Sequence, residues 1–321
     1  MDKEFSLDLY RRMVRIRKFE EGVIEVYLRG LMPGLAHSYV GEEAVAVGVC
    51  AALRTDDYLT STHRGHGHLI AKGGKTDRMM AEILGKETGY NRGRGGTMHI
   101  ADTSLGILGA NGIVGGSFGM AAGAGWTAKM RGKGQVVACF FGDGATNQGA
   151  LSESMNLASI YKLPVIYVLE NNGYGQFTSR ERASGCARFG DRAEAFCLKA
   201  NDGYGQDIFG VFKVMSEIVE RVRSGGGPEF VEFKTYRYGG HHVGDPGKAY
   251  RAAEEIEEWK TNRDPLKLCS QKLIADKVAS SEEIEAIDNE IQREIDEAIE
   301  FAKASEFPKP SEVGRYVYPD A

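Results

Sequence analysis

The chain has 321 residues, of which 42% are hydrophobic and 26% are charged, and its formal net charge is −5. No apolar run approaches the ~20 residues of a membrane-spanning helix, and the acidic balance argues against nucleic-acid binding, although Arg92 and Arg94 alternate with glycines. Residues 1–8 form neither a signal peptide nor a transit sequence, and the five cysteines contain no close pair, so we expect reduced thiols and a cytoplasmic location.

The first third of the chain predicts helices followed by a long glycine-rich region. Apolar residues recur at steps of three and four over 7–29 and over 41–53, a periodicity that is typical of amphipathic helices. Residues 60–120 are rich in glycine and histidine, and they carry helix signals only near 76–84. A long loop-bearing region of this kind often carries function when a scaffold holds it.

A β-α-β unit follows this region. Continuous apolar runs at 135–141 and 164–169 predict parallel strands buried on both faces, and residues 150–161 between them predict a helix. A helix over 208–223 and a strand over 230–235 continue the alternation. We therefore expect an α/β fold with a mostly parallel sheet and helices on both faces.

The C-terminal region predicts a helical extension from about residue 252. Residues 280–283 resemble a capping box, and five isoleucines between 284 and 299 mark one face of a long acidic helix. The chain contains no internal repeat and no convincing linker. We therefore expect residues 1–321 to form a single domain, with helices at its N-terminus and this extension at its C-terminus.

Polar residues follow both strands of the β-α-β unit. Gly-Asp-Gly at 142–144 ends the first apolar run, and Asn-Asn-Gly at 171–173 ends the second. Because the carboxyl ends of neighbouring parallel strands meet at one edge of a sheet, Asp143 and Asn172 should lie close together. Their oxygens suit Mg²⁺, and the amides of residues 144 and 145 precede a helix, where a phosphate is favoured. Together the segments predict a magnesium–diphosphate clamp, although either one alone reads equally as a tight turn.

These motifs resemble the signature of thiamine diphosphate (ThDP) enzymes, and the resemblance extends along nearly the whole chain. The sequence is similar to the alpha subunit of the E1 component of 2-oxo-acid dehydrogenase complexes, and most of all to that of acetoin dehydrogenase. The matching stretches are THRGHG at 62–67, GGTMH at 95–99, GANGIVG at 109–115, TYRY at 235–238, GH at 240–241 and DP at 245–246. The fingerprint G-x-G-x-x-G of nicotinamide-binding oxidoreductases is not met at 142–147.

The resemblance implies the ThDP-binding fold and a role for each matching position. It assigns Mg²⁺ to Asp143, Asn172 and the carbonyl of Tyr174; cofactor contacts to Arg64, Gly112, Val114, Gly142, Gly144, Ala145, Asn172 and His241; and catalysis to His63 and His241. The Gly112 and Val114 backbone would meet the aminopyrimidine. Gly239 stands where family members often carry a bulkier or basic residue, which weakens the assignment of His241.

The histidines at 63, 66 and 68 have two other interpretations. They could form a Zn²⁺ cluster, because imidazole is a common zinc ligand, although no cysteine or carboxylate completes a familiar set. His66 and His68 could equally be hydrogen-bonded structural residues.

By resemblance, ThDP supplies an ylide that attacks the carbonyl group of a small substrate. We expect cleavage of acetoin to acetaldehyde and a hydroxyethyl-ThDP intermediate, which passes to a lipoyl-bearing E2 partner. Pyruvate dehydrogenase E1 alpha is the main alternative, and a non-catalytic subunit that binds ThDP only for assembly is another. No glutamate here stands in the motif that activates the cofactor, so an E1 beta subunit should supply it within an α₂β₂ tetramer.

Overall fold

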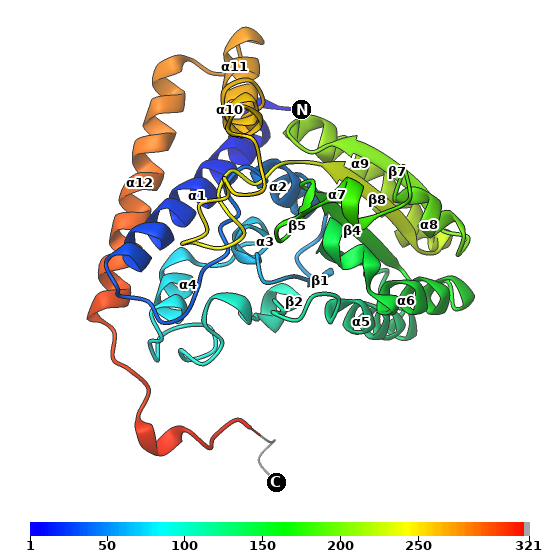
Figure 1. The fold of residues 1–321 in the computed structure, drawn as a ribbon, viewed down its shortest axis with the longest axis horizontal. Helices are drawn as coiled ribbons and strands as arrows, with labels where there is room; N and C mark the ends of the chain where they lie inside the picture. Colours follow the sequence, from blue (N-terminus) through cyan, green and yellow to red (C-terminus); the bar gives the residue numbers. More distant parts are fainter. Residues whose placement is uncertain (318–321) are drawn as a thin grey trace.

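The computed structural model describes residues 1–317, and its centre is a parallel sheet (Figure 1). Six strands lie in the order β2-β1-β3-β4-β8-β7, and each neighbouring pair is parallel. The strands are β1 Tyr58–Thr60, β2 Ile107–Gly109, β3 Val137–Gly142, β4 Val165–Asn171, β7 Lys199–Tyr204 and β8 Glu229–Lys234, and an antiparallel hairpin adds β5 Tyr174–Gly175 and β6 Thr178–Ser179. The predicted α/β class is therefore confirmed.

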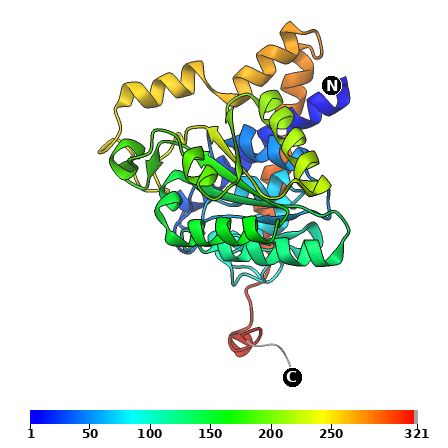
Figure 2. The same ribbon diagram turned by 90° about the vertical axis from the view of Figure 1, so that its right-hand side faces the viewer.

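Helices cover both faces of the sheet. Figures 1 and 2 show α5 and α6 side by side along one face, while α2 and α9 pack together on the other. The α-helices are α1 Lys3–Leu28, α2 Glu43–Ala51, α3 His66–Ala71, α4 Thr76–Ile83, α5 Ser117–Arg131, α6 Gly149–Ile160, α7 Arg180–Ala183, α8 Gly190–Glu194, α9 Ile208–Arg221, α10 Ala253–Asn262, α11 Pro265–Ala275 and α12 Ser281–Ala304. Shorter helical turns are η1 Gly96–Met98, η2 Thr103–Leu105, η3 Asp143–Asn147, η4 Val222–Gly226 and η5 Pro310–Glu312.

The central strands divide the hydrophobic core into two layers. Successive side chains of a strand point to opposite faces, so Phe140 and Val168 pack with the helices on the α1 side, while Phe141 and Leu169 pack on the α5 side. All residues of β4 are buried. This double burial explains why β3 and β4 read as continuous apolar runs in the sequence.

Long helices cover one flank of the sheet. α12 lies beside α1 (Figure 1) and buries the isoleucine face that its sequence predicts. Ser280 caps this helix, because its Oγ accepts from the Glu283 amide at 3.2 Å while the Glu283 carboxylate accepts from the Ser280 amide at 2.8 Å. Beyond α12 the chain continues past the end of α4 (Figure 1), where Lys86 Nζ donates to the Ser305 carbonyl at 2.9 Å and Arg94 lies 3.6 Å from Glu312. None of the helices in the described part of the chain is both long and apolar enough to cross a membrane.

The sequence prediction lacks several elements that the structure contains, among them β1, β2, α3, α5 and β7. Residues 60–120 contain the buried helix α3, although glycine and two histidines give it poor helix signals, because tertiary packing overrides weak propensity there. The edge strand β7 has no apolar pattern, since only one of its sides is paired and most of its residues are partly exposed.

Candidate active site

The strand ends bring Asp143 and Asn172 to one cavity. Gly142 at the end of β3 pairs in register with Glu170 of β4, so the segments that follow the two strands leave the sheet at the same edge. The two residues line a cavity of about 330 Å³. Asn172 is held in place, because its Nδ2 donates to Glu42 Oε1 at 3.0 Å and its Oδ1 accepts from the Tyr174 amide at 3.2 Å.

The cavity gathers most of the residues that the sequence singled out. Its lining includes His63, Arg64, Val114, Gly142, Asp143, Gly144, Ala145, Asn172, Tyr174 and His241. Gly112 is outside this lining, and its amide donates to Nε2 of His99 at 3.4 Å. The structure thus brings the candidate residues together from both halves of the chain, whereas their individual roles stay predictions.

A close approach of two glycines shapes the floor of the cavity. A Cβ atom added to Gly144 would lie 3.0 Å from the Cα of Gly175, which is tighter than ordinary van der Waals contact. The absence of side chains therefore lets the β5–β6 hairpin press against the loop that follows β3. This contact places the Tyr174 backbone beside Asp143 and Asn172, the three groups from which the sequence predicts a cation site.

Asp143 sits in a poorly solvated position. It is 4% exposed, and this burial raises the pKa of its carboxyl group to about 6, against the effect of the backbone amides of Gly144 and of Asp143 itself. A buried carboxylate normally has a cationic partner. The Asp143 carboxylate, the Asn172 amide oxygen and the Tyr174 carbonyl are a donor set that fits a hydrated Mg²⁺.

Two arginines add positive charge to the same cavity. Arg237 is 1% exposed, and burial together with the nearby Arg64 lowers the pKa of its guanidinium to about 10. Its Nη2 donates to the Gln176 carbonyl at 2.8 Å, but its buried Nε has no partner among the described residues. Two guanidinium groups with an orphaned donor fit a phosphate-bearing ligand. Arg237 lies inside a matching motif, yet the sequence alone gave it no role.

Buried acids complete the polar wall. Burial and the neighbouring Glu170 raise the pKa of Glu42, whereas Arg64 opposes that shift. Arg64 Nε lies 3.6 Å from Glu42 Oε2, which makes no hydrogen bond within the described residues. Glu170 accepts instead from Tyr39 and contacts Nε2 of His68 at 3.0 Å. The sequence missed Glu42, because a glutamate at the start of a predicted helix carries no distinguishing signal.

The histidines separate into a structural pair and a cavity group. Both nitrogens of His66 are engaged, by Glu20 at 3.1 Å and Thr97 at 2.8 Å, and both nitrogens of His68 are likewise engaged. The zinc cluster of His63, His66 and His68 is therefore wrong. His63 instead meets His37 and His241, with ring centroids 4.7 and 5.2 Å away.

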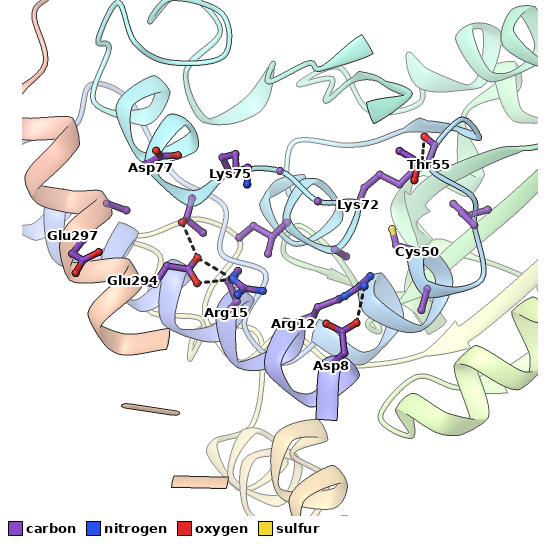
Figure 3. A pocket seen from close by; sticks show the side chains of 18 of the residues that line it. Asp8, Arg12, Arg15, Cys50, Thr55, Lys72, Lys75, Asp77, Glu294 and Glu297 are labelled. Carbon is purple, nitrogen blue, oxygen red and sulfur yellow. Dashed lines mark hydrogen bonds and ion pairs between the residues drawn. The ribbon is translucent and has the colours of Figure 1, made fainter. Parts of the chain in front are cut away.

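A second cavity, of about 810 Å³, is a poorer candidate (Figure 3). It lies among α1, α2, α4 and α12, and its charged side chains largely satisfy one another. Arg15 Nε donates to both Glu294 oxygens at 2.9 Å, Arg12 lies 2.6 Å from Asp8, and Lys72 donates to the carbonyls of Arg54 and Thr55. These internal pairs leave little charge for a ligand.

Comparison with known proteins gives the same assignment along the chain. Residues 11–311 match the family model described as Dehydrogenase E1 component. The acetoin:2,6-dichlorophenolindophenol oxidoreductase alpha subunits of Bacillus subtilis and Cupriavidus necator are 46% and 45% identical, over 99% of this chain and 95% of each relative. The pyruvate dehydrogenase E1 alpha subunit of Zymomonas mobilis is 40% identical over 98% of this chain and 90% of its own length. This chain therefore belongs to the dehydrogenase E1 component family, as an alpha subunit of an oxidoreductase.

Proposed function

We propose that this chain is the alpha subunit of a ThDP-dependent E1 enzyme that cleaves acetoin. The observation that carries the choice of substrate is the likeness, at 46% and 45% identity over nearly the full length, to two alpha subunits named as acetoin oxidoreductases. The family membership supports the cofactor. We place the enzyme in the cytoplasm, because its scattered cysteines favour reduced thiols.

The residues around the cavity would hold the cofactor through Mg²⁺. Asp143, Asn172 and the carbonyl of Tyr174 would be the protein ligands of the ion, whose charge would favour the binding of the diphosphate. Gly142 and Gly144 leave room for this group, and the amides of residues 144 and 145 would donate to it. When bound, ThDP supplies the carbanion chemistry that cleaves the carbon–carbon bond and releases acetaldehyde.

The remaining lining residues would orient the reactants. Arg64 would neutralise phosphate charge with a fixed fork of donors. His63 and His241 are half-buried, and burial lowers the pKa of both imidazoles, so they are neutral at pH 7 and can hydrogen-bond to a bound substrate. The backbone of Gly112 and Val114 would contact the pyrimidine end of the cofactor, and the Val114 side chain would support the cofactor there.

The mouth of the cavity suggests that another chain completes it. Ile113 is 74% exposed and Val114 is 45% exposed, although both are apolar and lie at the cavity. Such side chains at the rim of a site favour a partner surface. An E1 beta subunit in an α₂β₂ tetramer would cover them and supply the activating glutamate, and the two-carbon product would pass to a lipoyl-bearing E2.

Pyruvate is the second candidate substrate. Its support is the 40% identity to the pyruvate dehydrogenase E1 alpha subunit of Zymomonas mobilis, over nearly the same span. The two substrates differ in their first product, because pyruvate releases carbon dioxide and acetoin releases acetaldehyde.

Product analysis tests the proposal. The alpha and beta chains are reconstituted with Mg²⁺ and ThDP, supplied with acetoin or pyruvate, and given 2,6-dichlorophenolindophenol as electron acceptor. We expect acetaldehyde from acetoin with reduction of the dye. Carbon dioxide from pyruvate without acetaldehyde from acetoin would overturn the choice of substrate.

Replacement of one histidine tests whether the chain is catalytic. His63→Ala should keep α–β assembly and lower turnover by about 100-fold, in the range for loss of one hydrogen-bond donor at the reacting group. Undiminished turnover with normal assembly would favour the alternative in which the chain binds ThDP only to assemble the complex.

A further inference from the structure

Three imidazoles at the cavity form a compact cluster. His37, His63 and His241 come from distant parts of the sequence, yet one nitrogen of each lies within 4.8 Å of the others. We propose that these histidines form a binding site for a transition metal of the Zn²⁺ class, with ligands different from those proposed for Mg²⁺. The sequence suggested a zinc cluster of His63 with His66 and His68, whereas the structure groups His63 with His37 and His241.

An unpartnered nitrogen points to a missing ligand. His37 is 8% exposed, and its buried Nδ1 has no hydrogen-bond partner among the described residues. Most buried polar side-chain atoms have such a partner. Burial lowers the pKa of His37 and His241 to about 3 and also lowers that of His63, so protons do not compete for the nitrogens at pH 7.

Small side-chain movements suffice to form the site. Zn–N bonds of ~2.0–2.1 Å put the nitrogens of a tetrahedral site about 3.4 Å apart, so no separation between the three nitrogens must shorten by more than about 1.4 Å. His241 Nδ1 faces Nη1 of Arg237 at 3.0 Å. Metal binding at either nitrogen of this ring releases that hydrogen bond, because Nε2 can bind only when the proton occupies Nδ1, which then faces a guanidinium that has no acceptor.

Charged groups of both signs surround the cluster. Arg64 and Arg237 oppose a cation, whereas the carboxyl groups of Glu42 and Asp245 favour one. Asp245 also accepts from the His241 amide at 2.6 Å. Binding therefore depends on direct bonds to nitrogen more than on Coulomb attraction. Imidazole ligands select Zn²⁺, Ni²⁺ or Cu²⁺ over Mg²⁺, which prefers oxygen.

Occupation of this site would inhibit the enzyme. In the proposed function, His63 and His241 contact the bound cofactor and substrate. A metal on these rings would therefore compete with the cofactor and the substrate for binding. This consequence rests on the proposed function, while metal binding itself does not.

Co²⁺ titration of the full chain, freed of metal and without ThDP, tests the site. Tetrahedral nitrogen-ligated Co²⁺ absorbs strongly in the visible range, whereas octahedral oxygen-ligated Co²⁺, as expected at Asp143, absorbs weakly. We expect one equivalent to produce the strong band and Zn²⁺ to abolish it. His37→Ala and His63→Gln should each weaken binding by about 100-fold or more, since even residues that only orient a metal ligand contribute 10–100-fold. The exposed His99 provides the matched control, and His99→Ala should leave the titration unchanged.

Two results of this titration would contradict the proposed metal site. No strong band in the wild type, or the same affinity in both variants, overturns the site. If His37→Ala fails to fold, His63→Gln still tests the site, because His63 is only half-buried. In the assembled α–β complex, saturating Mg²⁺ and ThDP should remove the band, and a band that persists beside bound ThDP overturns the competition. Failure of ThDP to bind even to the complex would count against the proposed function instead.

Discussion

Asp143 combines burial with a charge that the metal-free chain does not neutralise. Its pKa rises from 3.8 to about 6 on folding, so the folded state holds the proton more tightly than the unfolded state. The stability that this carboxyl group supports is therefore present below about pH 4 and is lost as the pH rises through about 6. A shift of this size corresponds to about 3 kcal/mol.

We predict that Asp143→Asn stabilises the metal-free chain at pH 7 by up to about 3 kcal/mol, and by progressively less toward pH 4, because the amide cannot ionise. Urea unfolding in EDTA over this pH range measures the difference. Asp191→Asn, an exposed control, should shift stability by less than about 0.5 kcal/mol. A stability gain at Asp143 that is independent of pH would contradict this account.

At the scale of elements, the glycine contact below the cavity holds the hairpin against the loop after β3. Gly175→Ala should push the two apart, because the new Cβ would lie 3.0 Å from the Cα of Gly144. We expect Mg²⁺-dependent ThDP binding to weaken by about 10-fold, equivalent to about 1.4 kcal/mol and within the usual cost of overpacking. Gly185→Ala is the matched control, since nothing lies within 4 Å of its added Cβ. Equal calorimetric titrations for both variants would exclude a role for the contact.

The start of α12 allows a second test on an element. Ser280→Ala removes the side-chain cap of the helix that packs on α1, and we expect a loss of about 1 kcal/mol of unfolding free energy. The neighbouring Ser281→Ala makes the same chemical change at the first helical position and should cost little. Parallel urea denaturation curves for the two variants measure the difference. Equal midpoints would mean that the capping box does not stabilise the fold.

The elements that sequence predicts well are those with a strong pattern. β3 and β4 are buried on both faces, so their apolar runs are continuous, and the polar residues after them mark the sheet edge. The edge strand β7 and the short helix α3 lack such a pattern. The positions of Glu42 and Arg237 at the cavity, and the contact of His37 with the histidines that line it, arise only from the folding of distant segments, and no local spacing reveals them.

For the whole molecule, the exposed apolar rim of the cavity predicts a covered surface in the complex. Ile113→Asp should weaken α–β association by about 10-fold or more, because a charge would be buried at the interface. The isolated alpha chain should keep its melting temperature, since Ile113 is 74% exposed there. Light scattering after size-exclusion chromatography of the mixed chains measures assembly. Full assembly of the variant would place the beta subunit elsewhere.

Cofactor titration of the assembled complex tests the central claim most directly. We predict that ThDP binds to the α–β complex only with Mg²⁺, and that Asp143→Ala weakens this binding by about 100-fold or more while the chains still assemble. Calorimetric titration with and without Mg²⁺ provides the comparison. An identical, Mg²⁺-independent titration for the wild type and Asp143→Ala would contradict the claim that the two strand ends hold the cofactor through a metal ion.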